Sequence, residues 1–101
     1  MKYNQFQIDT HVWQYPGMSG WHFLTIPKKT ALEIDKEFSN LKRGWGSLPV
    51  NVKIGKTNWK TSIFPDKESG GYMLPLKSEV RKKESLKEGT KVCLFFEIVL
   101  T

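Results

Sequence analysis

The sequence is poor in the residues that build disulfides and metal centres. Its single cysteine, Cys93, excludes a disulfide within the chain, and His11 and His22 without a third ligand make a poor metal site. Cys93 lies in an apolar run, so we expect it to be buried as a small hydrophobic residue. A glycine-rich phosphate loop is also missing, because Gly44–Trp45–Gly46 is too short for one. We expect neither a metal nor a cofactor.

Long apolar segments and catalytic constellations are absent too. No run approaches the roughly 18 apolar residues that span a bilayer, and a polar stretch follows Met1 and Lys2 where a secretion signal has an apolar one. The carboxylates form no pair that can be placed across a cleft, and Ser62 has no histidine near it in the sequence. We therefore expect a cytoplasmic protein without a membrane partner and without enzymatic activity.

Aromatic and basic residues are what the chain has in quantity. Of its 101 residues, 13% are aromatic and 39% hydrophobic, which is enough for one compact core. The sequence therefore predicts a single domain over residues 1–101. The net charge of +6 agrees with a partner that carries phosphates or acidic groups, and it agrees equally with a plain soluble surface.

Alternation of apolar and polar residues predicts about six strands. The predicted strands are Tyr3–Tyr15, Trp21–Ile26, Leu48–Ile54, Trp59–Phe64, Tyr72–Leu76 and Val92–Leu100. Turns at Pro16–Gly20 and Gly55–Asn58 predict two hairpins, one from the first two strands and one from the third and fourth. The second strand is apolar on both faces, and Pro75 indicates an edge or a bend in the fifth.

Two short helices are also predicted. Apolar residues at helical spacing indicate a helix over roughly residues 30–39, with Thr30 and Glu33 as a capping box. Residues 78–84 are long enough for about two helical turns, with Ser78 as the N-cap. Strands at close intervals, joined by tight turns, favour a small barrel or a sandwich over a parallel sheet.

Four blocks of the sequence resemble a known family. They are Trp21–Pro27, Gly44–Val50, Trp59–Pro65 and Leu74–Arg81, in that order. The chain resembles the bacterial domain-of-unknown-function family nineteen-oh-five. The resemblance implies a mainly β fold, a small, partly open β-barrel loosely akin to the double-split barrels of AbrB-type transcription factors. It implies no particular activity.

The stretch from Arg43 to Arg81 contains the candidate binding residues. Lys60 and Ser62 share one strand face, and Lys77 and Arg81 share one face if their segment is helical. A lysine, a hydroxyl and an arginine that converge can hold a phosphate or a carboxylate. The same residues are also compatible with solvated surface cations and an ordinary strand hydroxyl.

Trp45 and Trp59 complete the candidate ligand-binding set. Their rings can offer flat faces to a base, a sugar or another flat ligand, and they can equally pack in the barrel core or cover its ends. We therefore expect a non-enzymatic binding module for a small anionic or flat ligand.

The alternative is a basic nucleic-acid-binding or transcription-associated dimer. Between Glu37 and Asp66 the chain has no acidic residue, and its basic residues are interleaved with aromatic ones. This pattern is typical of nucleic-acid contact. The basic residues of the stretch are Lys42, Arg43, Lys53, Lys56 and Lys60. The sequence leaves the oligomeric state open.

Overall fold

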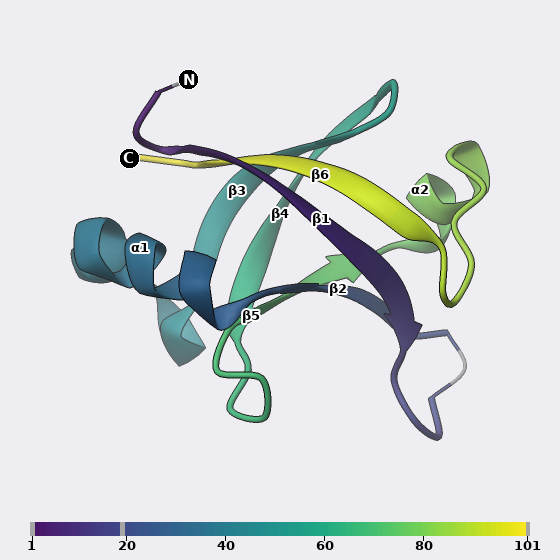
Figure 1. The fold of residues 1–101 in the computed structure, drawn as a ribbon, viewed down its shortest axis with the longest axis horizontal. Coiled ribbons are helices and arrows are strands. Elements are labelled where there is room, and N and C mark those ends of the chain that lie inside the picture. The colour runs from purple at the N-terminus through teal and green to yellow at the C-terminus, as the bar shows by residue number, and fades with distance from the viewer. Residues whose placement is uncertain (1, 19, 101) are drawn as a thin grey trace.

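A computed structural model describes residues 2–18 and 20–100 of the chain. Residues 1, 19 and 101 lie outside the described part, so the predicted turn Pro16–Gly20 and the predicted domain 1–101 are described except for these positions. The described residues form a closed antiparallel barrel with the strand order β1-β2-β5-β4-β3-β6 (Figure 1). The strands are β1 (Gln5–Gln14), β2 (His22–Ile26), β3 (Leu48–Ile54), β4 (Thr57–Pro65), β5 (Tyr72–Leu76) and β6 (Lys91–Ile98).

The predicted fold class, a mainly β barrel of six strands with two helices, is confirmed. The two predicted hairpins are present, since β1 pairs with β2 and β3 pairs with β4. The expectation that the barrel is partly open is wrong, because hydrogen-bonded pairs connect every strand to two neighbours. Closure leaves no complete strand edge free to pair with another chain.

The ladders around the barrel differ in length. The β1–β6 ladder runs from Gln5↔Glu97 to His11↔Lys91, and the β3–β4 ladder is continuous from Leu48↔Ile63 to Ile54↔Thr57. Between β4 and β5 the register contains only Phe64↔Met73 and Pro65↔Tyr72. The barrel is therefore closed by a short seam between β4 and β5.

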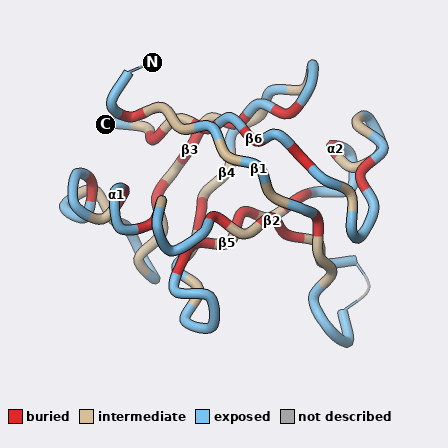
Figure 2. Tube along the Cα trace, viewed as in Figure 1, coloured by how far each residue is buried: buried red, intermediate tan, exposed pale blue. Residues whose placement is uncertain are grey.

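The core fills the inside of the barrel, and the buried positions alternate most clearly along β3, β5 and β6 (Figure 2). The helix α1 (Lys28–Phe38) packs Ala31, Ile34 and Phe38 against this core. The ring of Phe38 stacks on Tyr3 at a centroid distance of 5.7 Å. The predicted capping box is wrong: α1 begins before Thr30, after Pro27, and its N-cap has no side-chain hydrogen bond.

A polar cluster fastens α1 to the barrel. The Tyr72 hydroxyl donates a hydrogen bond to Asp35 Oδ1, and Lys42 Nζ lies 3.0 Å from the same oxygen. Burial, and then the bond to Asp35, raises the pKa of the Tyr72 phenol. The neighbouring Tyr72 and Asp35 side chains raise the pKa of Lys42 despite partial burial. Lys42 is thus an ion-pair partner of Asp35 rather than a free cation.

The helix α2 (Ser78–Lys83) lies beyond the end of β5, on the opposite side of the barrel from α1 (Figure 1). Val80 is buried, and Thr57 Oγ1 donates a 2.6 Å hydrogen bond to Glu84 Oε2 just after the helix. The N-cap position belongs to Lys77, so the prediction that Ser78 is the N-cap is wrong. These contacts tie the end of β5 to the β3–β4 hairpin.

Candidate binding groove

The seam between β4 and β5 is where a groove opens in the barrel wall. Beyond Met73, β5 continues to pair with β2 as far as His22↔Leu76, but it no longer pairs with β4. Pro75 lies in this part of β5 and has no N–H to donate to a ladder. This part of β5, where Pro75 predicts an edge or a bend, is thus an edge on its β4 side, and one side of β4 from Trp59 to Ser62 has no partner strand.

The groove at this seam has a volume of about 580 Å³, and we call it the tryptophan groove. Its walls come from β2, β4, β5 and the loop that precedes β3. The aromatic and apolar part of its lining includes Trp21, Phe23, Trp45, Trp59, Phe64 and Pro75. Three of the four tryptophans of the chain thus meet at one groove.

Trp45 is held at the groove in a strained conformation. Its backbone has φ +62° and ψ +21°, in the left-handed region that a bulky side chain rarely occupies, and the residue is 92% exposed. Hydrogen bonds from Arg43 N to Ser47 O, 2.8 Å, and from Gly46 N to Arg43 O, 2.9 Å, close the loop around it. Neither burial nor packing explains why a tryptophan occupies this position.

Trp21 is supported from behind by other aromatic rings. It contacts Phe23 and Tyr15 edge-on, at centroid distances of 6.4 and 6.5 Å, and remains 55% exposed. The fourth tryptophan, Trp13, does not line the groove and donates its indole N–H to Thr25 Oγ1 at 2.8 Å. The exposed Trp21 ring is therefore positioned by packing, while Trp13 is a structural residue.

Lys60 and Lys77 supply the positive charge of the groove. Both are exposed, both line it, and among the residues that the structure describes neither has a carboxylate partner. His22 lies in the wall, and among the described residues its buried Nδ1 atom has no hydrogen-bond partner. An unpaired buried polar atom costs about 1–3 kcal/mol, so this nitrogen is a second feature that packing does not explain.

The structure thus brings four of the six predicted site residues together: Trp45, Trp59, Lys60 and Lys77. Ser62 does not line the groove and lies opposite Pro49 in the β3–β4 ladder. Arg81 stands behind the wall, where its Nε donates to Leu76 O at 3.2 Å and its Nη2 to Gly20 O at 3.4 Å. These two bonds join the turn before β2 to the end of β5.

The sequence interpretation missed Trp21, Phe23 and Phe64, which line the same groove. A signal for two of them was available, since Trp21–Ile26 is apolar on both faces. A strand in a small barrel buries only one face in the core, so a second apolar face indicates another apolar surface outside. The position of Phe64 follows from where the β4–β5 ladder stops, which the sequence alone does not specify.

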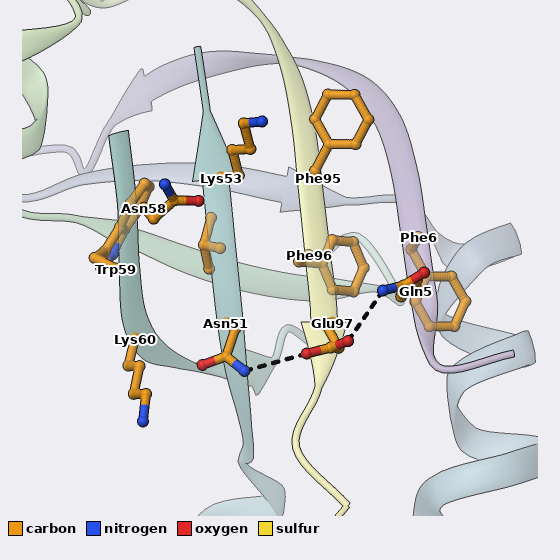
Figure 3. Close-up of a pocket in the computed structure, with 11 residues that line it drawn as sticks. Gln5, Phe6, Asn51, Lys53, Asn58, Trp59, Lys60, Phe95, Phe96 and Glu97 are labelled. Atoms are coloured by element: carbon orange, nitrogen blue, oxygen red, sulfur yellow. Dashed lines mark hydrogen bonds between the residues drawn. The ribbon is translucent and has the colours of Figure 1, made fainter. Parts of the chain in front are cut away.

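A second depression, of about 540 Å³, lies on the outside of β1, β6, β3 and β4 (Figure 3). We call it the outer depression. At its centre the Glu97 carboxylate accepts hydrogen bonds from Gln5 Nε2 at 3.0 Å and Asn51 Nδ2 at 3.2 Å. The bond from Asn51, and then that from Gln5, lowers the pKa of Glu97. Phe95, 39% exposed, stands on the same outer face.

Cys93 is exposed, so the prediction of a buried cysteine is wrong. Inward and outward residues alternate along β6, and Cys93 falls on an outward position between buried Val92 and Leu94. Gln7 Nε2 lies 3.4 Å from its sulfur. His11 faces Lys91, not His22, and no group of three metal-ligating side chains occurs among the described residues. Within the same residues, no helix is long and apolar enough to cross a bilayer.

A comparison with known protein families shows to which family the chain belongs. The model of the family described as "Domain of unknown function (DUF1905)" matches residues 9–94. The chain belongs to this family. The matched residues of the DUF1905 domain include every strand and helix that lines the tryptophan groove, together with most of β1 and the first half of β6. The search among curated proteins found no match.

Proposed function

We propose that this DUF1905 domain is a non-enzymatic binding module that holds a small, flat, anionic ligand in the tryptophan groove. The observation that carries the proposal is Trp45, which is strained, 92% exposed and one of three tryptophans that line the groove. Backbone strain of this kind costs about 1–3 kcal/mol and is concentrated at functional sites. We place the module in the bacterial cytoplasm.

The binding mode follows from the two kinds of side chain in the groove. Tryptophan rings offer flat faces for stacking, which contributes about 1–3 kcal/mol for each stacked base in complexes of single-stranded nucleic acids. Lys60 and Lys77 can each contact an anionic group as a point charge. Since both lysines are exposed, their contribution depends on salt and is smaller than that of the rings.

The composition of the lining supports binding rather than acid–base catalysis. The described residues of the groove include no carboxylate and no thiol. A catalyst of proton transfer needs a base and an acid within hydrogen-bond reach of the reacting group, and His22 is the one histidine among the described lining residues. The proposal therefore assigns no catalytic residue.

Isothermal titration with adenosine monophosphate, adenosine and inorganic phosphate tests this function. We expect the monophosphate to bind more tightly than either of its halves, because it uses both rings and lysines. Trp45→Ala should weaken binding of the monophosphate and of adenosine by about tenfold, the loss of one stacking contact. Lys60→Ala and Lys77→Ala should weaken binding of the monophosphate and leave adenosine unchanged.

Lys56→Ala is the matched charge control, since Lys56 is exposed and does not line the groove. Leu32→Ala, at an exposed apolar residue of α1, is the control for loss of apolar surface. Equal affinities of the wild-type chain and Trp45→Ala for each of the three probes would contradict the proposal. So would a loss of affinity in Lys56→Ala as large as in Lys60→Ala.

The second candidate is a basic nucleic-acid-binding or transcription-associated dimer. It is supported by the net charge of +6 and by Lys53 and Lys60, which stand on one outer surface of the barrel. It requires affinity for duplex DNA and a second copy of the chain. A gel shift with random duplex DNA at two salt concentrations, together with sedimentation of the free protein, separates it from the first proposal. A monomer without affinity for duplex DNA would contradict it.

A further inference from the structure

The tryptophan groove and the outer depression meet on β4. Trp59 and Lys60 line both of them. Lys60 points outward from the barrel in register with Asn51 on β3, and Asn51 in turn donates to Glu97 on β6 (Figure 3). The two hollows therefore adjoin at Lys60 and form one surface over β5, β4, β3 and β6, while the Trp59 ring, in register with buried Val52, packs against the core.

Aromatic rings lie at both ends of this surface, together with lysines that have no ion-pair partner among the described residues. Trp21, Trp45 and Trp59 mark one end and Phe95 the other, while Lys77, Lys60 and Lys53 lie between or beside them. From β4 to β6 the surface extends over two strand spacings, roughly 10 Å in addition to the groove itself. A single flat anion bound in the groove makes no contact with Phe95 or Lys53.

We infer that the flat anionic ligand is one nucleotide of a single-stranded nucleic acid, and that the strand continues across β4 into the outer depression. This inference rests on the proposed function, because the same three tryptophans stack the first base. Single strands are bound where a basic groove follows the backbone and aromatic rings stack successive bases. Lys60 then holds the point at which the strand crosses from one hollow to the other.

Glu97 sets the path of the phosphates in the outer depression. Its carboxylate is held ionised by two amide donors, so it repels a phosphate in its immediate neighbourhood. The phosphates therefore follow Lys60 and Lys53, and a base lies toward Phe95. Each oxygen of Glu97 can accept a further hydrogen bond, which suits an N–H group of a base such as the N3–H of thymine.

Fluorescence anisotropy with labelled oligothymidylates tests the inference, with thymidine monophosphate as an unlabelled competitor. We expect affinity to rise from the mononucleotide to the tetranucleotide and then to change little. Phe95→Ala should weaken binding of the tetranucleotide by about fivefold or more and leave the mononucleotide unchanged. If the lysines neutralise three phosphates, the logarithm of the association constant should fall with the logarithm of the salt concentration. The expected slope is about −2, from about −0.7 for each phosphate.

Lys53→Ala keeps the test valid if Phe95→Ala folds poorly, because Lys53 is exposed and its loss leaves the sheet intact. It should lower the affinity for the tetranucleotide and reduce the salt slope by about 0.7. Lys56→Ala, at the tip of the same hairpin, should do neither. An equal effect of Lys56→Ala shows unspecific charge attraction and overturns the inference.

Three further results would overturn it. If the mononucleotide binds as tightly as the tetranucleotide and Phe95→Ala changes nothing, the ligand is confined to the groove; the proposed function then stands and the strand does not. If duplex DNA or polyglutamate competes as well as the single strand, the occupant is not a single strand. If Trp45→Ala changes the affinity for neither mononucleotide nor tetranucleotide, the proposed function fails together with the inference.

Discussion

Two parts of the barrel differ in how many backbone hydrogen bonds join their strands and in which side chains they expose to solvent. One is the wall built by β1, β6 and β3, and the other is the seam between β4 and β5. In the wall the β1–β6 ladder is continuous, and its outward residues at Gln5, Glu97 and Asn51 form a hydrogen-bonded polar row. At the seam the ladder is limited to Phe64↔Met73 and Pro65↔Tyr72, and aromatic side chains surround the gap. Both regions enclose the same core.

The difference shows how a groove lined by aromatic side chains can be built without interrupting the barrel. A ladder that ends early frees space beside β4, and Pro75 prevents β5 from filling it with further hydrogen bonds. Rings from β2, β4 and the loop around Trp45 line that space instead. An edge left open in this way invites pairing with another chain unless bulky or charged side chains protect it, and Lys60 stands on it.

The largest expected effect concerns the core that the two regions share. Leu74 on β5 and Leu94 on β6 are both fully buried. Each change to alanine should lower the free energy of unfolding by about 2–5 kcal/mol, through lost burial and the cavity that remains. Chemical denaturation of both variants measures this. A small loss in Leu74→Ala beside a large one in Leu94→Ala would show that the seam is loosely packed.

The attachment of α1 beside the seam should have the next largest effect. Tyr72→Phe removes the hydrogen bond to Asp35 and should lower the free energy of unfolding by about 1 kcal/mol at neutral pH. Tyr72 has a raised pKa in the folded chain, so its contribution is complete below its ordinary value of 10.0 and is lost as pH rises through the folded value. Alkaline denaturation should therefore be less steep in Tyr72→Phe than in the wild-type chain. An identical alkaline profile would contradict this assignment.

Strain at Trp45 should appear as a smaller change of opposite sign. Trp45→Gly relieves the left-handed backbone and should raise the free energy of unfolding by up to about 1 kcal/mol, while ligand binding is lost. Trp45→Ala keeps the strain and loses the same ring, so it is the matched control. Thermal denaturation compares the two. A glycine variant less stable than the alanine variant would show that the native conformation at this position is not strained.

The smallest expected effect on stability concerns the polar row of Gln5, Glu97 and Asn51 on the wall. The pKa of Glu97 is lowered from 4.5, so its contribution to stability is present above that pH and is lost as pH falls through the folded value. Glu97→Gln should therefore make stability less sensitive to acid below pH 4.5, with little change at neutral pH. Glu88→Gln, in the exposed turn before β6, is the control. Equal acid sensitivity of the wild-type chain and Glu97→Gln would contradict the role of the two amides.

Alternating patterns predicted the strands well because each strand buries one face in a single core. The boundaries of β3 and β5 and the edge at Pro75 follow directly from such local signals. The patterns failed for Cys93, where an apolar neighbourhood concealed an outward position. Helix caps were also mispredicted, since Thr30 and Ser78 both fall inside their helices.

The candidate site was predictable only in part. Trp45, Trp59, Lys60 and Lys77 lie within one stretch of sequence, and their residue types suggest binding. Trp21 reaches the groove from a distant segment, through the pairing of β2 with β5. Ser62 and Arg81 were predicted from their side-chain chemistry, yet register places Ser62 on the β3–β4 pair and two carbonyl oxygens occupy Arg81. Long-range register is not encoded in local periodicity.

The most direct test of the central claim is a nuclear magnetic resonance titration of the four indole N–H groups with adenosine monophosphate. Trp21, Trp45 and Trp59 line the tryptophan groove, whereas the indole N–H of Trp13 is bound to Thr25. We predict that the signals of the first three shift in a saturable manner with one common dissociation constant and that the signal of Trp13 shifts least. Signals that do not move, or a largest shift at Trp13, would contradict the claim that the groove at the seam is the binding site.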